Sequence, residues 1–323
     1  MKKIAIIGAG QLGSRHLQGV VSSSHNYDIQ IVDLNNESLK VAEERYLQVK
    51  PKSSLSVLST YSSIDELSDE IDTVIIATNS NVRFKVLKEL LEKKSIKNLV
   101  IEKVLFQNLE EYDQAEELIL KHGVKAWVNH PRRMYPFYKK LKKELQNKEL
   151  SFTYVGGNWG LGCNGLHFLD CFSYLSSSEC TNIYSNLLDE EVYDSKRSNF
   201  KEFSGAITGK LNGSKFYISC LPETSAGFMT ISGENISVQI DEVAGWCRIK
   251  KMVDNKWLIE ECNEKIVYTQ SELTTLLLDD IEKDKCNLPG YEESMRLHKQ
   301  FLKVFLDHLN SQSDTYVKCC PIT

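Results

Sequence analysis

Short apolar runs alternate with amphipathic stretches along the first part of the chain. The run at residues 2–7 is typical of a buried strand, and similar runs follow at residues 29–33, 73–77, 98–101 and 125–128. Apolar positions at helical spacing predict helices between them, over residues 11–23, 37–49, 64–67, 81–93 and 109–122. Strands that alternate with helices indicate right-handed βαβ units, so we expect an α/β fold with a doubly wound parallel sheet.

The pattern changes after Asn129. Short turns separate consecutive strands, one of them a hairpin signal at Asn212-Gly213, which favours an antiparallel or mixed sheet. We expect these strands at residues 151–155, 227–231, 236–240, 246–251 and 256–261, and helices at residues 135–145, 166–175, 271–283 and 291–309. A chain of 323 residues suits two domains, which we place at residues 1–128 and 129–323.

Composition and charge narrow the class of protein. With 41% hydrophobic and 26% charged residues, the chain has the composition of a soluble globular protein. Its net charge of -5 gives no electrostatic reason to expect nucleic acid or a membrane surface as a partner. No apolar run reaches the roughly 18 residues that span a bilayer, and the first strand leaves no room for a signal peptide. Nine cysteines without a C-x-x-C pair indicate reduced thiols, so we expect a cytoplasmic protein.

A glycine-rich turn follows the first strand. Residues 8–13 read G-A-G-Q-L-G, which is the G-x-G-x-x-G spacing. In such a turn Gly8 allows a tight bend, Gly10 lets the backbone approach a pyrophosphate, and Gly13 lets the next helix pack against its strand. The phosphates then lie at the positive N-terminal end of that helix. This order of strand, turn, helix and second strand predicts a dinucleotide site.

An acidic residue ends the second strand. Asp33 lies twenty residues after Gly13, where its carboxylate can accept hydrogen bonds from both hydroxyls of an adenosine ribose. A 2'-phosphate at the same place would repel the carboxylate unless an arginine compensated, and residues 34–37 contain none. We therefore expect NAD(H) in preference to NADP(H).

Polar residues also follow two later strands. Thr78 and Asn79 come after the strand of residues 73–77, and Glu102 and Lys103 come after the strand of residues 98–101. Ligands of doubly wound sheets bind at the carboxyl ends of the strands. We therefore expect these side chains to lie at one crevice.

Together these motifs resemble those of the glucose-fructose oxidoreductase / inositol dehydrogenase / MocA (Gfo/Idh/MocA) family. The resemblance covers nearly the whole chain and depends on short motifs in a fixed order: Gly8-Ala9-Gly10-Gln11-Leu12-Gly13 with His16, Ile76-Ala77-Thr78-Asn79, Glu102-Lys103, Asn129, Arg132-Arg133 ahead of Pro136, Gly165-Leu166-His167 with Asp170, and Cys320-Pro321-Ile322-Thr323. It implies an N-terminal Rossmann domain and a C-terminal α+β domain with an open, mainly antiparallel sheet. It also implies a homodimer or homotetramer.

The resemblance further implies hydride transfer between nicotinamide and a hydroxyl carbon of a sugar, cyclitol or nucleotide sugar. Lys103 and His167 fall on the family's catalytic lysine and histidine, which is chemically sensible because alcohol oxidation needs a base for the proton and a cation near the developing alkoxide. Cofactor contacts are expected from Gly8, Ala9, Gly10, Gln11, Leu12, Gly13, Asp33, Thr78, Asn79, Glu102 and Lys103. Substrate contacts are expected from Lys103, Arg132, Trp159, Cys163, Asn164 and His167. We expect no metal site, because Cys163 and His167 lack further ligands at a telling spacing.

Three positions depart from the family's pattern. Cys163 stands where an aspartate is common, four residues before the histidine, which leaves Asn164 to bind a sugar hydroxyl or Asp170 to orient the imidazole. Val104 replaces the proline of Glu-Lys-Pro. Arg83 replaces a frequent histidine, and we interpret it either as a group that attracts an anion or as a solvated helix residue.

Two alternative functions stay open. In one, the cofactor remains bound and is recycled while the enzyme epimerises a sugar or cleaves a glycosidic bond. In the other, the protein is a catalytically inactive dinucleotide-binding sensor or partner, which the changes at Cys163 and Val104 suggest.

Overall fold

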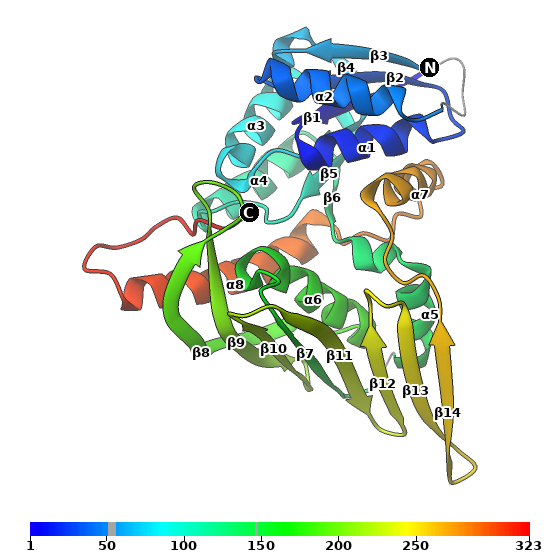
Figure 1. Ribbon diagram of the computed structural model, residues 1–323. Helices are drawn as coiled ribbons and strands as arrows, with labels where there is room; N and C mark the ends of the chain where they lie inside the picture. The colour runs from blue at the N-terminus through cyan, green and yellow to red at the C-terminus, as the bar shows by residue number, and fades with distance from the viewer. Residues whose placement is uncertain (51–55, 146–147) are drawn as a thin grey trace. The chain divides into compact units, whose positions relative to one another are not determined.

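The computed structural model describes residues 1–50, 56–145 and 148–323, which form two compact units (Figure 1). Unit 1 contains Met1–Met134 and Tyr268–Met295, and unit 2 contains Tyr135–Val267 and Arg296–Thr323. The segment Tyr268–Met295 thus packs with the N-terminal residues, whereas the predicted division placed it in the second domain. No helix of the described ranges is long and apolar enough to span a membrane.

Unit 1 is built on a six-stranded sheet with the order β3-β2-β1-β4-β5-β6, in which all neighbouring strands are parallel. This confirms the predicted doubly wound parallel sheet. The strands are β1 (Lys2–Ile7), β2 (Tyr27–Val32), β3 (Val57–Tyr61), β4 (Glu70–Ile76), β5 (Ser95–Glu102) and β6 (Lys125–Asn129). The sequence pattern did not predict β3, because this strand contains no continuous apolar run and none of its residues is fully buried.

The helical segments of unit 1 are α1 (Gln11–Val21), α2 (Asn36–Leu47), η1 (Ile64–Glu66), α3 (Ser80–Lys93), α4 (Glu110–Lys121), η2 (Pro131–Met134) and α7 (Gln270–Glu282). Helix α7 joins the unit by packing closely on α1. A Cβ atom added to Gly19 would lie only 2.4 Å from the carbonyl oxygen of Ser271. Thr275 also donates a 2.7 Å hydrogen bond to the Gly19 carbonyl. A small residue on α1 therefore explains why this late segment belongs to the first unit.

Unit 2 contains an eight-stranded sheet with the order β14-β13-β12-β11-β7-β10-β9-β8. Only the β7–β10 pair is parallel among these neighbours, which confirms the mainly antiparallel sheet. The strands are β7 (Leu150–Gly157), β8 (Cys180–Asp194), β9 (Lys201–Leu211), β10 (Ser214–Leu221), β11 (Ser225–Gly233), β12 (Ile236–Asp241), β13 (Trp246–Val253) and β14 (Lys256–Asn263).

Helices cover one face of this sheet. Helix α6 (Leu161–Ser176) packs on β7, β9 and β10, and α5 (Pro136–Leu145) lies beside α6. Helix α8 (Tyr291–Ser311) contributes its part from Arg296 onward, where the Phe305 ring lies 4.4 Å from the Phe203 ring of β9. Aromatic stacking between Phe152 and Phe172 fills the same layer. Large apolar side chains between helices and sheet thus form the core of unit 2.

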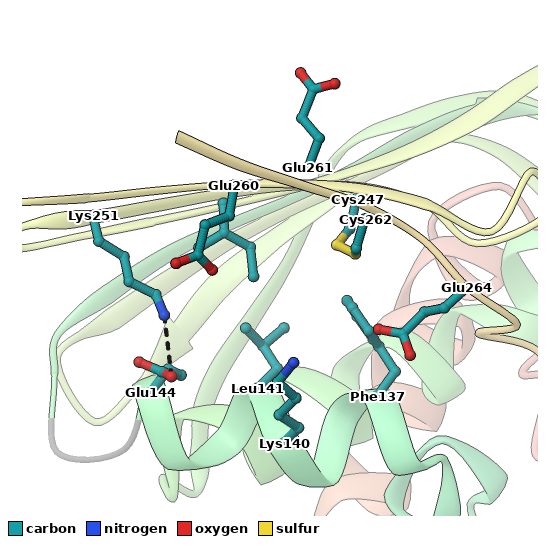
Figure 2. A pocket seen from close by; sticks show the side chains of 11 residues that line it. Phe137, Lys140, Leu141, Glu144, Cys247, Lys251, Glu260, Glu261, Cys262 and Glu264 are labelled. Atoms are coloured by element: carbon teal, nitrogen blue, oxygen red, sulfur yellow. Dashed lines mark ion pairs between the residues drawn. A yellow bond between two sulfur atoms is a disulfide. The ribbon is translucent and has the colours of Figure 1, made fainter. Parts of the chain in front are cut away.

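A disulfide joins two neighbouring strands of unit 2. Cys247 of β13 and Cys262 of β14 are direct partners in the antiparallel register, with Cα atoms 5.2 Å apart. This separation suits a disulfide, and the bond faces Phe137 and Leu141 of α5 (Figure 2). The expectation of reduced thiols is therefore wrong for this pair. No local motif signals it, because only the strand register brings the two cysteines together.

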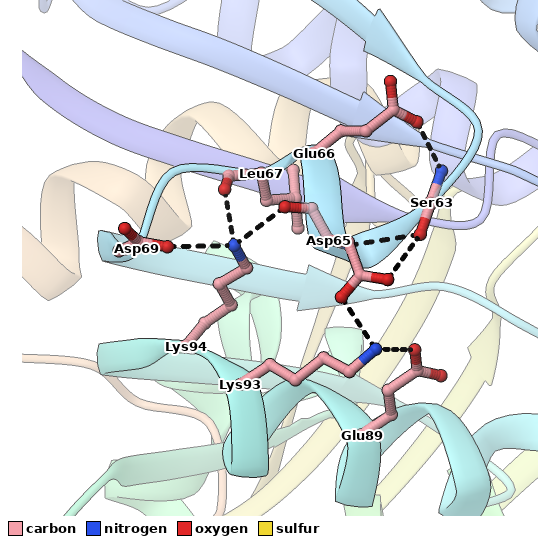
Figure 3. Close-up of polar contacts among 8 residues, drawn as sticks. All are labelled: Ser63, Asp65, Glu66, Leu67, Asp69, Glu89, Lys93 and Lys94. Atoms are coloured by element: carbon pink, nitrogen blue, oxygen red, sulfur yellow. Dashed lines mark hydrogen bonds and ion pairs between the residues drawn. The ribbon is translucent and has the colours of Figure 1, made fainter.

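A lysine is buried where α3 ends (Figure 3). The side chain of Lys94 is only 5% exposed. Its ammonium group donates to the Leu67 carbonyl at 2.7 Å, to the Asp65 carbonyl at 3.1 Å and to an Asp69 carboxylate oxygen at 3.1 Å. These three acceptors satisfy the buried charge, so Lys94 ties the end of α3 to the segment that contains η1.

We predict that Lys94→Met lowers the free energy of unfolding by about 2 kcal/mol, because it removes the donor from the buried Leu67 carbonyl and the partly buried Asp65 carbonyl. Lys93→Met is the matched control, since Lys93 makes only solvent-exposed ion pairs with Asp65 and Glu89, whose loss should change the free energy of unfolding little. Urea unfolding of both variants measures the difference. Equal losses would contradict the role given to Lys94.

Candidate dinucleotide and substrate site

The glycine-rich turn has the geometry that close phosphate approach requires. Gly8 has a φ of 98°, and its N–H donates to the Val32 carbonyl at 2.8 Å. A Cβ atom at Gly13 would lie 1.7 Å from the Gly8 carbonyl oxygen, so only glycine allows α1 to start there. A Cβ atom at Gly10 would meet nothing described within 4 Å. The backbone at Gly10 is therefore open to a ligand at the N-terminus of α1.

Hydrogen bonds hold the Asp33 carboxylate beside this turn. One oxygen accepts from the Ala9 N–H at 2.7 Å, and the other accepts from the Asn35 N–H at 2.8 Å. Each carboxylate oxygen has a second lone pair for a further donor. Asp33 is half-buried, so a ribose hydroxyl can reach it without displacing either backbone contact.

A pocket of about 500 Å³ lies along these strand ends, entirely within unit 1. Among the predicted cofactor residues it is lined by Gly8, Gly10, Asp33, Thr78 and Asn79. The other six, Ala9, Gln11, Leu12, Gly13, Glu102 and Lys103, do not line it. Thr78 is half-buried and lines the pocket, whereas its hydroxyl oxygen is itself buried and has no hydrogen-bond partner among the described residues. The lining therefore fits a dinucleotide.

Arg45 lies close to the glycine-rich turn and was not predicted. Its guanidinium donates to the Gln11 carbonyl at 3.2 Å and also to the side chains of Gln11 and Ser14. Residues 34–37, next to Asp33 in sequence, contain no arginine. Arg45 comes instead from the last turn of α2, which packs on α1.

A buried polar network fixes the end of β5. The Glu102 carboxylate accepts from His16 Nε2 at 2.9 Å and from the Asn129 amide, and it is 3% exposed. On the other side of the imidazole, His16 Nδ1 lies 2.8 Å from the Thr274 hydroxyl of α7. A carboxylate can only accept, so Nε2 of His16 carries a proton. Glu102 thus faces the interior and positions the residue after it, Lys103.

The charge of Glu102 is retained in this network. Burial raises the pKa of its carboxyl group, but the hydrogen bond and charge of His16, the Asn129 amide and the charge of Arg83 outweigh burial, and the pKa lies below its ordinary value. The ionised form therefore stabilises the folded state.

Arg83 is buried and faces backbone carbonyls. Its guanidinium donates to the carbonyls of Thr78 and Val104, and to that of Leu105 at 3.1 Å. The interpretation of Arg83 as a solvated helix residue is therefore wrong, and its role as a group that attracts an anion stays a prediction. Arg83 instead ties the loop after β4 to the segment that follows Lys103. Three carbonyl acceptors thereby hold the backbone that the family's proline would otherwise restrain.

Lys103 and Arg132 belong to one electropositive region of unit 1. The positive charges of both lower the pKa of His130. This histidine is buried, and its Nε2 atom lies 3.1 Å from the Ser294 hydroxyl. Burial lowers the pKa of His130 well below its ordinary value, and the charges of Arg133, Lys103 and Arg132 lower it further. The imidazole is therefore neutral near pH 7, and the positive charge of the region comes from lysine and arginine.

The remaining substrate candidates lie in unit 2, around the start of α6. Glu202 of β9 places its carboxylate at the first amides of this helix, where the N–H groups of Gly162 and Cys163 donate to it at 2.8 and 3.2 Å. A Cβ atom at Gly160 would lie 2.7 Å from a Glu202 carboxylate oxygen. The glycines at 160 and 162 therefore make room for an acidic group that was not predicted, next to Cys163.

Asn164 and Trp159 also make hydrogen bonds to neighbouring residues. The Asn164 amide donates to the Trp159 carbonyl at 2.6 Å, and the Trp159 indole N–H donates to the Ser219 carbonyl at 3.1 Å. The Trp159 ring packs edge-on against Tyr154 and Phe168. His167 follows on α6 and is half-buried. Cys163, Asn164 and His167 thus share one helix, and Lys103 and Arg132 belong to the other unit.

Comparison with known proteins assigns this architecture. Residues 2–130 match the family described as GFO_IDH_MocA, an oxidoreductase family with an NAD-binding Rossmann fold. Residues 2–130 are therefore similar to the NAD-binding Rossmann domain of the Gfo/Idh/MocA family. This confirms the resemblance drawn from the sequence motifs and the expected NAD(P)-binding Rossmann domain.

Two curated proteins are similar to this chain over part of their length. It is 28% identical over 199 residues to the uncharacterized oxidoreductase YrbE of Bacillus subtilis, covering 56% of this chain and 55% of YrbE. It is 24% identical over 213 residues to myo-inositol 2-dehydrogenase of Thermotoga maritima, covering 59% of this chain and 60% of that enzyme.

Solved structures share the fold over nearly the whole chain. A super-repressor mutant of Gal80p from Saccharomyces cerevisiae has a TM-score of 0.75 at 14% identity, covering 96% of each chain. UDP-N-acetylglucosamine 3-dehydrogenase GnnA from Acidithiobacillus ferrooxidans has a TM-score of 0.69 at 17% identity, covering 94% of this chain and 96% of GnnA. At these identities the likeness shows the fold alone.

Two glycine substitutions separate ligand binding from folding. Gly10 has an ordinary φ of -61°, so we expect Gly10→Ala to keep the free energy of unfolding within about 1 kcal/mol. Its new methyl group projects into the open space at the turn and should weaken NADH binding at least tenfold. Gly13→Ala should instead destabilise the fold by roughly 3 kcal/mol or more. Calorimetric titration and urea unfolding check both, and undiminished NADH affinity in Gly10→Ala would contradict the assigned turn.

Acid unfolding tests the buried carboxylate. Since the pKa of Glu102 is lower when folded, its stabilisation is complete above the unfolded value near 4.5 and is lost as the pH falls through the folded value. We expect Glu102→Gln to cost about 2 kcal/mol at pH 7 and to flatten the decline in stability below pH 4.5. The exposed Glu92→Gln is the control. Parallel pH profiles for Glu102→Gln and the natural protein would count against this role.

Proposed function

We propose that this protein is an NAD-dependent oxidoreductase that transfers a hydride between nicotinamide and a hydroxyl carbon of a sugar, cyclitol or nucleotide sugar. The supporting observation is the pocket of unit 1, where Gly10 is open to a ligand and the Asp33 carboxylate is held ready for ribose hydroxyls. The names of two relatives, an inositol dehydrogenase and a UDP-N-acetylglucosamine dehydrogenase, support a polyhydroxylated substrate.

Residues of unit 1 have two roles in this proposal, to hold the cofactor and to stabilise charge on the substrate. Bound NAD supplies the hydride acceptor. Gly8, Gly10, Asp33, Thr78 and Asn79 hold it. The positive ammonium group of Lys103 stabilises negative charge that develops on the substrate oxygen. The backbone of Lys103 is held in place because it follows Glu102, which is fixed by His16 and Asn129.

On the substrate side, His167 accepts the hydroxyl proton at its imidazole. Arg132, Trp159, Cys163 and Asn164 complete the proposed substrate contacts. The Glu202 carboxylate supplies, next to Cys163, the acidic group that the family commonly places on the helix itself.

NAD is the proposed cofactor rather than NADP. A 2'-phosphate would stand beside the Asp33 carboxylate, and the guanidinium of Arg45 is directed to Gln11 and Ser14. We expect NADH to bind at least tenfold more tightly than NADPH, and Asp33→Ser to reduce this preference. Parallel fluorescence titrations measure both, and similar affinities in the natural protein would contradict the preference.

Turnover tests the catalytic roles. Purified protein is mixed with NAD and pooled sugars, cyclitols or nucleotide sugars, and NADH formation is followed by absorbance. Lys103→Met and His167→Asn should each lower kcat by about 100-fold or more while NADH still binds. Lys97→Met is the matched control, because Lys97 is an exposed lysine of β5, the strand that ends just before Lys103, and this variant should keep full activity. Full activity in both site variants would refute their roles.

Two alternatives predict different results in the same assay. A recycling epimerase or glycosidase would form product without net NADH, which mass spectrometry of the sugars would detect. A non-catalytic binding protein would bind NADH and form no product, and the fold it shares with the regulator Gal80p makes this the second candidate. A cytoplasmic location and a homo-oligomeric state also remain proposals.

A further inference from the structure

Arg45 is held against the first turn of α1 at both ends of the residue. It belongs to the last turn of α2, and the two helices lie side by side in unit 1 (Figure 1). The Arg45 carbonyl accepts from the side-chain amide of Gln18 at 3.1 Å. Its guanidinium donates to the backbone carbonyl and the side-chain oxygen of Gln11 and to the Ser14 hydroxyl. The guanidinium is therefore fixed beside the N-terminus of α1.

This position adds a positive charge to the positive end of a helix. The N-cap residue of α1 is Gly10, which has no side chain to cap the first amides, and the first turn contains no acidic residue. A cation at that end is unfavourable, because the helix dipole is also positive there. The negative end of α2 offsets part of this cost, since Arg45 lies in the last turn of that helix. An anion at the start of α1 is attracted by both the amides and the guanidinium.

The same contacts set the direction of two donors of Gln11. Its side-chain oxygen accepts from Arg45, so its amide nitrogen, which can only donate, is turned away from the guanidinium. The Ser14 hydroxyl accepts from Arg45 and donates to the Gly10 carbonyl at 2.7 Å. In a trans peptide the next N–H points opposite to that carbonyl, so the Gln11 N–H points out of the helix end. Both donors follow directly on Gly10, which lines the pocket of unit 1.

We propose that Arg45 is a positioning residue for the diphosphate of the dinucleotide. It holds Gln11 so that the backbone N–H and the side-chain amide of Gln11 donate to phosphate oxygens, and its own charge attracts the diphosphate. This role rests on the proposed function, in which NAD binds along Gly10 and Asp33. Arg45 acts on NADH and NADPH alike, because both contain the diphosphate and the guanidinium is committed to Gln11 and Ser14.

Ligand binding to the full chain tests this role. Calorimetric titration measures NADH and NADPH, and ligand-observed NMR measures adenosine, which has no phosphate. We expect Arg45→Met to weaken both dinucleotides by a similar factor, roughly tenfold, and to keep the affinity for adenosine within about twofold, which also shows that the variant is folded. An equal loss for adenosine, or a loss confined to NADPH, would overturn the role.

Arg15→Met is the matched control for the loss of an arginine. Arg15 is exposed on α1, and its guanidinium donates to the side-chain oxygen of Gln18 at 2.8 Å instead of to the first turn. We expect this variant to bind NADH within about twofold of the natural protein. A loss equal to that of Arg45→Met would show a general effect of charge and contradict the positioning of Gln11.

A double-mutant cycle tests whether Arg45 acts through Gln11. We expect Gln11→Leu to weaken NADH binding several-fold, and the double variant with Arg45→Met to bind within about twofold of Arg45→Met alone, because one side chain positions the other. Losses that multiply in the double variant would overturn this coupling. NADH affinity unchanged in Arg45→Met refutes the role of Arg45 alone, whereas NADH binding without turnover of any sugar refutes the proposed oxidation and leaves this role standing.

Discussion

The buried carboxylate of Glu102 is the constraint on which the candidate site depends. It joins α1 through His16 and β6 through Asn129, at the point where β5 ends. Because His16 in turn lies against Thr274, the same network includes α7, which comes late in the chain. An ionised group in a buried position is costly unless it is fully hydrogen-bonded, so these partners must form together. The backbone that carries Lys103 is fixed as a result.

Arg83 performs a related task on the neighbouring loop. Its three carbonyl acceptors come from the segment after β4 and the segment after Lys103, so one guanidinium holds together two strand ends that line or flank the pocket. The glycine-rich turn supplies the third strand end, where Gly13 allows α1 to pack and Gly10 stays open. Interior polar groups thus set the shape of unit 1 while leaving Thr78 and Asp33 accessible to a ligand.

Much of this could be predicted from sequence because the signals are local. Apolar runs between helical patterns gave the parallel sheet, and the spacing of the glycines located the turn. The missed features depend on contacts distant in sequence. Thr274 meets His16, Glu202 meets the start of α6, and Cys247 meets Cys262, each through packing or strand register. Arg83 was misinterpreted because a charged residue on an amphipathic helix gives no sign of burial among carbonyls.

The most direct test of the account is a crystal structure of the protein with NADH bound. We predict that the adenosine ribose hydroxyls lie on the Asp33 carboxylate, that the diphosphate lies beside Gly10 at the N-terminus of α1, and that the nicotinamide is directed toward Lys103. A dinucleotide bound elsewhere, or a pocket that excludes it at saturating NADH, would contradict the account.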